Sequence, residues 1–126
     1  MHVIDFNKDT VIKLSPIAPA DLMPTIASFL VTGEEAVMVF KTVRDQVVFT
    51  NKRIIATNVQ GLIGKKIDYT SVPYRKINMF SVITAALLDL SCELELSISE
   101  VGKIRFEING SFDIVKLNRV ISEYVL

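Results

Sequence analysis

The residue types that most often carry catalysis are scarce in this chain, and their spacing matches none of the usual constellations. The chain has one cysteine, Cys92, and one histidine, His2, which lies near the N-terminus. A nucleophilic cysteine needs a neighbouring base or a lowered pKa, and one cysteine with one histidine does not complete a zinc ligand set. We therefore interpret Cys92 as a small, partly buried residue. We expect no catalytic residue, no bound metal and no cofactor.

Glu93 and Glu95 are the pair of carboxylates whose spacing suits acid–base chemistry. Residues at i and i+2 share one face of a strand, as two catalytic carboxylates must share a site. Lys103 and Arg105 follow at the same spacing in the next apolar–polar segment. These four side chains are therefore better explained as the water-facing surface of a hairpin.

Basic residues are concentrated between Lys41 and Lys76, although the net charge of the whole chain is zero. This segment holds eight basic residues and only two acidic ones. Six of the basic residues are candidate ligands for an anionic partner. They are Lys41, Arg44, Lys52, Arg53, Lys65 and Lys66. A chain without net positive charge is not expected to bind nucleic acid in general.

Two interpretations of these basic residues stay open. They are either solvated strand ends that protect the sheet edges, or a weak binding surface for an acidic peptide or for anionic lipid head groups. Adjacent lysines in a strand point to opposite faces, so Lys65 and Lys66 do not grip one anion together. Arg53 and Arg75 lie at strand or turn boundaries, where a salt bridge within the chain or between subunits is favoured.

Hydrophobic periodicity predicts the elements that position these residues. Strands are predicted at 34–43, 46–50, 53–59, 65–71, 77–84, 93–99 and 103–108. Residues 22–30 are predicted to form a short helix with Asp21 as its N-cap, and residues 112–126 an amphipathic helix with Ser111 as its N-cap. Val11–Leu14 reads only as a short extended segment. Seven strands in meander order with a closing helix predict a mainly β fold: a partly open antiparallel barrel, capped by the C-terminal helix.

The chain is apolar, with half of its residues hydrophobic and a mean hydropathy of +0.41. No apolar run approaches the roughly 20 residues of a membrane span, and the N-terminus lacks the pattern of a signal peptide. A single cysteine fits a reducing compartment, so we expect a cytoplasmic protein. Strands 36–43 and 77–84 are apolar on both faces, which predicts self-association. The expected interface residues are Val37, Val39, Met79 and Ile83.

Several segments resemble one known family. They are VRDQVVFTNKRII (43–55), VQGLIGKKIDYTSVPYRKI (59–77), FSV (80–82), DLSCELEL (89–96) and ISEYVL (121–126). Over residues 33–126 the chain resembles the bacterial pleckstrin-homology (PH) domain family, with residues 1–32 as an N-terminal extension that holds a short helix. The resemblance implies a seven-stranded PH-like barrel. It also implies a stand-alone cytoplasmic domain that assembles into ring-like homo-oligomers and whose biochemical role is largely unknown.

From these observations we expect a non-enzymatic, self-assembling domain that acts as a homo-oligomeric scaffold or adaptor. The alternative is an anion-binding module for acidic lipid head groups or an acidic peptide.

Overall fold

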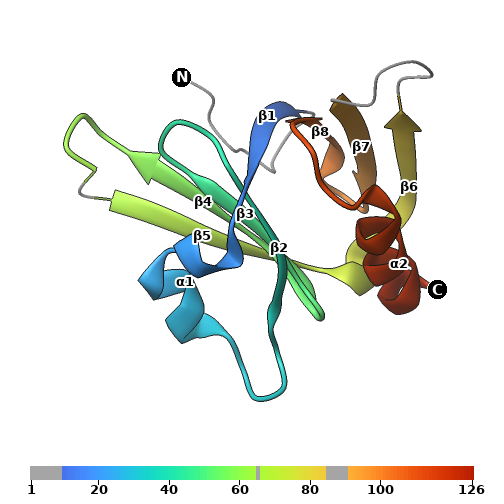
Figure 1. Ribbon diagram of the computed structural model, residues 1–126, viewed down its shortest axis with the longest axis horizontal. Helices are drawn as coiled ribbons and strands as arrows, with labels where there is room; N and C mark the ends of the chain where they lie inside the picture. Colours follow the sequence, from blue (N-terminus) through green and yellow to red (C-terminus); the bar gives the residue numbers. More distant parts are fainter. Residues whose placement is uncertain (1–9, 65, 85–90) are drawn as a thin grey trace.

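Alternating apolar residues build a curled sheet of eight strands in the computed structural model, which describes residues 10–64, 66–84 and 91–126 (Figure 1). The strands are β1 (Thr10–Ile17), β2 (Ala36–Lys41), β3 (Gln46–Thr50), β4 (Arg53–Gln60), β5 (Lys66–Pro73), β6 (Ile77–Thr84), β7 (Ser91–Ile98) and β8 (Gly102–Asn109). Their order across the sheet is β5-β4-β3-β2-β1-β8-β7-β6. The sheet forms a half-barrel, and helix α2 (Ile114–Val125) caps it. The predicted mainly β, PH-like architecture is confirmed.

Strand β1 adds one strand to the predicted seven and joins the two halves of the sheet. It pairs antiparallel with β2 and parallel with β8, and Ile12 lies opposite Phe106 in that parallel register. Ile12 and Leu14 alternate into the core, so the short extended segment of the sequence is a full sheet strand. The boundary at residues 32/33 stays a prediction, although β1 itself belongs to the sheet.

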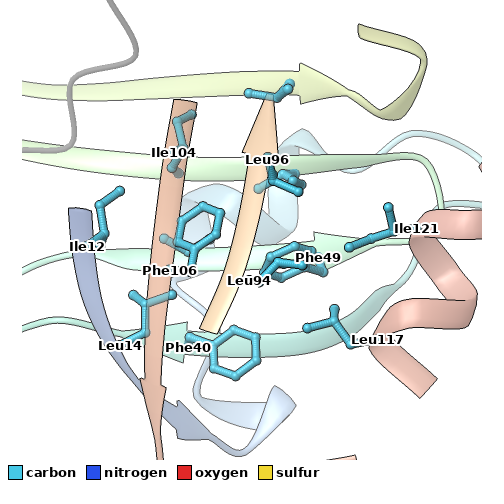
Figure 2. Close-up of a cluster of buried hydrophobic side chains, with 14 of the residues drawn as sticks. Ile12, Leu14, Phe40, Phe49, Leu94, Leu96, Ile104, Phe106, Leu117 and Ile121 are labelled. Carbon is cyan, nitrogen blue, oxygen red and sulfur yellow. The ribbon is translucent and has the colours of Figure 1, made fainter. Parts of the chain in front are cut away.

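The main core fills the concave side of the sheet. Leu94, Leu96 and Phe106 point inward from β7 and β8, and all three are fully buried. Leu117 and Ile121 point toward them from α2, as Figure 2 shows. The predicted alternation of the last hairpin and the apolar face of the closing helix are therefore confirmed.

A second, smaller core lies on the outer face of strands β2–β4. Ile26 of helix α1 (Pro24–Phe29) packs there on Val39, Val48 and Ile55, and each of these side chains is at most 2% exposed. Strand β2 is thus covered on both faces, as its sequence indicated. The cover on the outer face comes from the same chain.

The predicted N-caps of both helices are wrong. Asp21 belongs to a 3₁₀ helix (Pro19–Asp21), and α1 begins only after Met23, because a residue before proline is held in extended conformation. At α2 the cap is Asp113, whose carboxylate accepts a hydrogen bond from the N–H of Lys116 at 3.0 Å. Ser111 lies exposed before it.

No helix within the described residues is long and apolar enough to cross a membrane.

Candidate functional site

The six basic candidate residues do not gather at one place. Lys52 and Arg53 lie at the β3–β4 turn, whereas Lys41 ends β2 and Lys66 begins β5 at the opposite end of the same strands. Strand β4 separates these two ends by eight residues, or about 25 Å at the usual rise per residue. Lys65 lies outside the described residues. A single anion therefore does not meet all of these side chains.

Arg53 is held by an intrachain ion pair. Its Nη2 and Nε bind the two carboxylate oxygens of Glu34 at 2.9 and 3.0 Å. The same guanidinium donates to the hydroxyl of Ser71 and to the carbonyl of Phe29. The interpretation of Arg53 as a salt-bridge residue is confirmed, and the partner is within the chain. Its guanidinium is engaged on several sides and is not available as an anion ligand.

Glu34 is equally well satisfied. Its side chain is fully buried and accepts hydrogen bonds from the hydroxyl of Thr50 and from the N–H of Val31 in addition to those from Arg53. Burial alone would raise the pKa of this carboxyl. The hydrogen bonds and the positive charge of Arg53 outweigh burial, so the pKa of Glu34 lies below its ordinary value.

Arg44 also has a structural contact. Its Nη2 donates to the carbonyl of Gly61 at 2.7 Å, which joins the β2–β3 turn to the β4–β5 turn. Asp45 beside it is only 3% exposed and accepts hydrogen bonds from the hydroxyl of Thr57 and from the N–H of Val59. Arg44 and Asp45 together fix the β2–β3 and β4–β5 turns at one end of the sheet.

The paired carboxylates Glu93 and Glu95 face cations on the neighbouring strand. Arg105 binds Glu95 at 2.9 Å and Glu93 at 3.7 Å, and Lys103 lies 3.9 Å from Glu95. The predicted water-facing surface of the hairpin is confirmed. Both carboxylates are engaged in ion pairs with cations of the neighbouring strand.

Cys92 is buried in the half-barrel at 8% exposure, beside a hollow of about 120 Å³ lined by Phe112 and Ile114. Burial, helped by the negative charge of Glu93, raises the pKa of its thiol. The side chain therefore stays a protonated thiol at neutral pH, which makes it a poor nucleophile. Within the described residues, no group of three or more His, Cys, Asp or Glu side chains stands close enough to hold a metal ion.

The four residues expected at a subunit interface differ in their exposure. Val39 is buried under α1 at 2% exposure, which contradicts its assignment to an interface, because its second face is covered within the chain. Val37 lies half-buried where the β2–β3 register shifts. Met79 and Ile83, in contrast, are 57% and 45% exposed.

Met79 and Ile83 share the outer face of β6, the last strand of the described sheet. They lie opposite Ser97 and Glu93 of β7, whereas Phe80 and Val82 of the same strand pack on the core. Among the described strands, β6 therefore combines an unpaired backbone edge with an uncovered apolar face. This edge is the strongest candidate for a contact with another polypeptide.

Sequence reasoning missed a group of exposed apolar residues in two turns. Val43 is 98% exposed, and Leu62 and Ile63 are 102% and 73% exposed. Their signal in the sequence is an aliphatic residue placed inside a turn, as in Gly61-Leu62-Ile63-Gly64. Turns are usually polar, so such residues call for an explanation.

A family model described as "Bacterial PH domain" matches residues 5–125. The uncharacterized protein YjqA of Bacillus subtilis (strain 168) is 44% identical over 85 residues, which cover 68% of each chain.

Solved structures agree with this match. The chain is similar to a DUF1696 family protein with a pleckstrin-homology domain from Shewanella loihica PV-4, with a TM-score of 0.73, 32% identity, and coverage of 91% of this chain and 99% of the other. It is also similar to a pleckstrin homology domain from Shewanella amazonensis SB2B, with a TM-score of 0.60, 36% identity, and coverage of 87% and 90%.

Proposed function

Because this chain belongs to the bacterial PH domain family, we propose that it is a non-enzymatic domain that assembles with copies of itself and acts as a scaffold or adaptor. The observation that carries this proposal is the β6 edge, where Met79 and Ile83 stand exposed beside a strand backbone that no other described strand pairs. An open edge of this kind is a template for pairing with another chain. Glu93 and Glu95 are engaged in ion pairs, and Cys92 is a buried thiol with a raised pKa. These observations support a role without catalysis.

The two free edges of the described sheet favour a cyclic assembly. Strand β5 ends the sheet on one side and β6 on the other, so the two edges present different surfaces. Ile67 of β5 is 38% exposed, which gives this edge an apolar position too. A contact between β6 of one copy and β5 of the next is heterologous, and such contacts form rings when the rotation between copies closes.

Light scattering coupled to size-exclusion chromatography tests this proposal with charged variants. Met79→Lys with Ile83→Lys places two cations on the proposed contact, and lysine on an edge strand opposes pairing. Because both side chains are exposed, we expect the variant to stay folded and to elute as a monomer of 14.1 kDa.

A matched control is Val115→Lys, which changes an equally exposed residue (61%) on α2. We expect this variant to keep the mass of the unmodified protein. If the β6 double variant assembled like the control, the contact would lie elsewhere and the proposed use of β6 would be wrong.

A further inference from the structure

A hollow of about 450 Å³ lies beside β5, between the end of this strand and the β7–β8 turn. Its volume falls within the range of sites that hold small ligands, roughly 300–1,000 Å³. Residues 70–73 of β5 form one wall, and residues 98–101 form the other. Consecutive strand residues point to opposite faces, so a wall of four in a row includes the backbone edge of β5. That edge is the outer one of the described sheet.

The hollow has an apolar floor. Val72 and Ile98 belong to the main core and are only 7% and 8% exposed, and both line the hollow. Val101, which packs on the same core, lines it beside them. An apolar group of a ligand would therefore be removed from water on this floor.

Two opposite charges stand on the two walls. Lys76 ends the 3₁₀ helix Tyr74–Lys76 that follows β5, and Glu100 lies in the β7–β8 turn. Both are exposed, and within the described residues neither has an ion-pair partner. The hydroxyls of Thr70 and Ser99, in contrast, donate to neighbouring side chains of the chain. The lining therefore offers a ligand one cation and one anion around an apolar floor.

Glu100 occupies a backbone position that suits glycine. Its φ is +66°, the positive φ of a non-glycine residue in the described chain. It lies inside the tight turn that the N–H of Val101 closes on the carbonyl of Ile98, at 3.2 Å. A side chain in the left-handed region is strained, and strained residues cluster at functional sites. A glutamate kept there destabilises the turn, which indicates that its carboxylate has a use at the hollow.

We propose that this hollow binds a short extended peptide whose two ends are free. The carboxylate of the peptide pairs with Lys76 and its ammonium group with Glu100, and an apolar central side chain lies on the floor. Its N–H and C=O groups bond to the open edge of β5, as when a peptide adds a strand to a sheet. Four strand residues span about 10 Å, which matches the length of an extended tripeptide.

The arrangement of charges favours a peptide over smaller ligands. A simple anion or cation would satisfy one wall alone, and a free amino acid carries both of its charges on one carbon. A peptide separates the two charges and supplies amide groups between them, which an open strand edge requires. The length of the wall and the charges at its two sides therefore point to the same class of ligand.

The strand edge that binds the peptide also contacts a neighbouring copy in the proposed assembly. Peptide binding is therefore measured on the chain with Met79→Lys and Ile83→Lys, which we call the parent variant. Neither substitution lies in the lining of the hollow. The proposal does not rest on self-assembly, because the hollow is formed within one chain.

Titration of the isotope-labelled parent variant with the tripeptide Ala-Val-Ala, followed by amide NMR, provides the first test. We expect the N–H signals of residues 70–72 and 99–101 to shift, and those of α2 to stay unchanged. The same peptide with acetylated and amidated ends lacks both charges and should bind at least about tenfold more weakly. Ala-Ser-Ala should bind about threefold more weakly, because its central side chain buries less apolar surface.

Substitutions on the two walls assign each end of the peptide. Lys76→Gln and Glu100→Gln should each weaken binding about fivefold. The matched control is Arg75→Gln, an exposed position of the same 3₁₀ helix outside the lining, which should bind like the parent variant. Acetylation of the peptide N-terminus alone should weaken binding to the parent variant but not to Glu100→Gln, because that variant already lacks the partner of the ammonium group.

Glu100→Gly separates a binding role from a structural one. Glycine adopts a positive φ without strain, so this variant should have a higher unfolding midpoint than the parent variant. It should also bind Ala-Val-Ala about fivefold more weakly, because the carboxylate is gone. A residue that served only the turn would not lose binding as the fold gained stability.

Three results would overturn the proposal. They are signals of residues 70–72 and 99–101 that do not move with millimolar peptide, a doubly blocked peptide that binds as tightly as the free one, and a Glu100→Gln variant that binds as tightly as Arg75→Gln. Failure of self-assembly would appear instead in the mass of the unmodified protein, so the two failures are distinguishable.

Discussion

Arg53 grips both carboxylate oxygens of Glu34, with Nη2 2.9 Å from Oε1 and Nε 3.0 Å from Oε2. The pair connects the segment before β2 to the start of β4, and the same arginine reaches the carbonyl of Phe29 at the end of α1. It therefore holds the helix, and the second core beneath it, against the sheet. Arginine suits this position because its planar fork matches a carboxylate in two places.

Arg53→Ala should destabilise the domain by about 3 kcal/mol, because it leaves the buried charge of Glu34 without its partner. Urea unfolding followed by circular dichroism measures this change. Lys52→Ala, at the exposed neighbouring position, should alter the free energy of unfolding by less than about 0.5 kcal/mol. Equal effects of the two variants would show that the ion pair contributes nothing to stability.

Glu34 should make the stability depend on pH. Its pKa is lower in the folded chain than the ordinary 4.5, so the folded state binds this proton less readily than the unfolded state. The stabilisation is fully present above pH 4.5 and is lost as the pH falls through the folded value. Urea unfolding between pH 7 and pH 3 should show a loss in the unmodified protein and a smaller loss in Glu34→Gln. Glu35→Gln, which changes an exposed carboxylate, should retain the full dependence. If the stability of Glu34→Gln depended on pH in the same way as that of the unmodified protein, another group would cause the dependence.

Asp113→Ala should destabilise α2 by about 1 kcal/mol, the usual cost of removing an N-cap. Its carboxylate accepts from the Lys116 N–H, and Ser111 lies outside the helix, two residues before this cap. Ser111→Ala should therefore leave the thermal midpoint almost unchanged. A larger effect at Ser111 than at Asp113 would contradict the position of the cap.

Val39→Lys and Met79→Lys should have different effects on the stability of the fold. Val39 is buried between β2 and α1, so a lysine there is expected to unfold the domain, by several kcal/mol. Met79 is exposed, so its lysine variant should keep the circular dichroism spectrum and the unfolding midpoint. If the Val39→Lys protein stayed folded and its assembly had a lower mass in solution than that of the unmodified protein, Val39 would belong to the subunit interface after all.

Local pattern was enough to predict most of the sheet. Strands β3 and β6 begin and end where the sequence predicts, because apolar runs are bounded there by turn residues. The alternation of Leu94 and Leu96 with Glu93 and Glu95 assigns the core face and the charged face of β7. Turn residues and apolar–polar alternation are local signals, so they can be recognised without knowing which strands pair.

Non-local pairing is what the sequence does not show. Ile12 and Leu14 alternate correctly, yet nothing near them indicates that β1 pairs with β8, far along the chain. For the same reason the cover on Val39 is invisible in the sequence, because it comes from Ile26 of α1. The basic residues cluster in sequence but separate in space, because the β3–β4 and β4–β5 turns lie at opposite ends of β4.

The mass of the unmodified protein in solution tests the central claim of self-assembly most directly. Sedimentation velocity at micromolar concentration should show one species whose mass is at least twice the 14.1 kDa of one chain. The mass should fall to that of one chain when β6 carries Met79→Lys and Ile83→Lys. An unmodified protein that sediments as a 14.1 kDa monomer would contradict the claim.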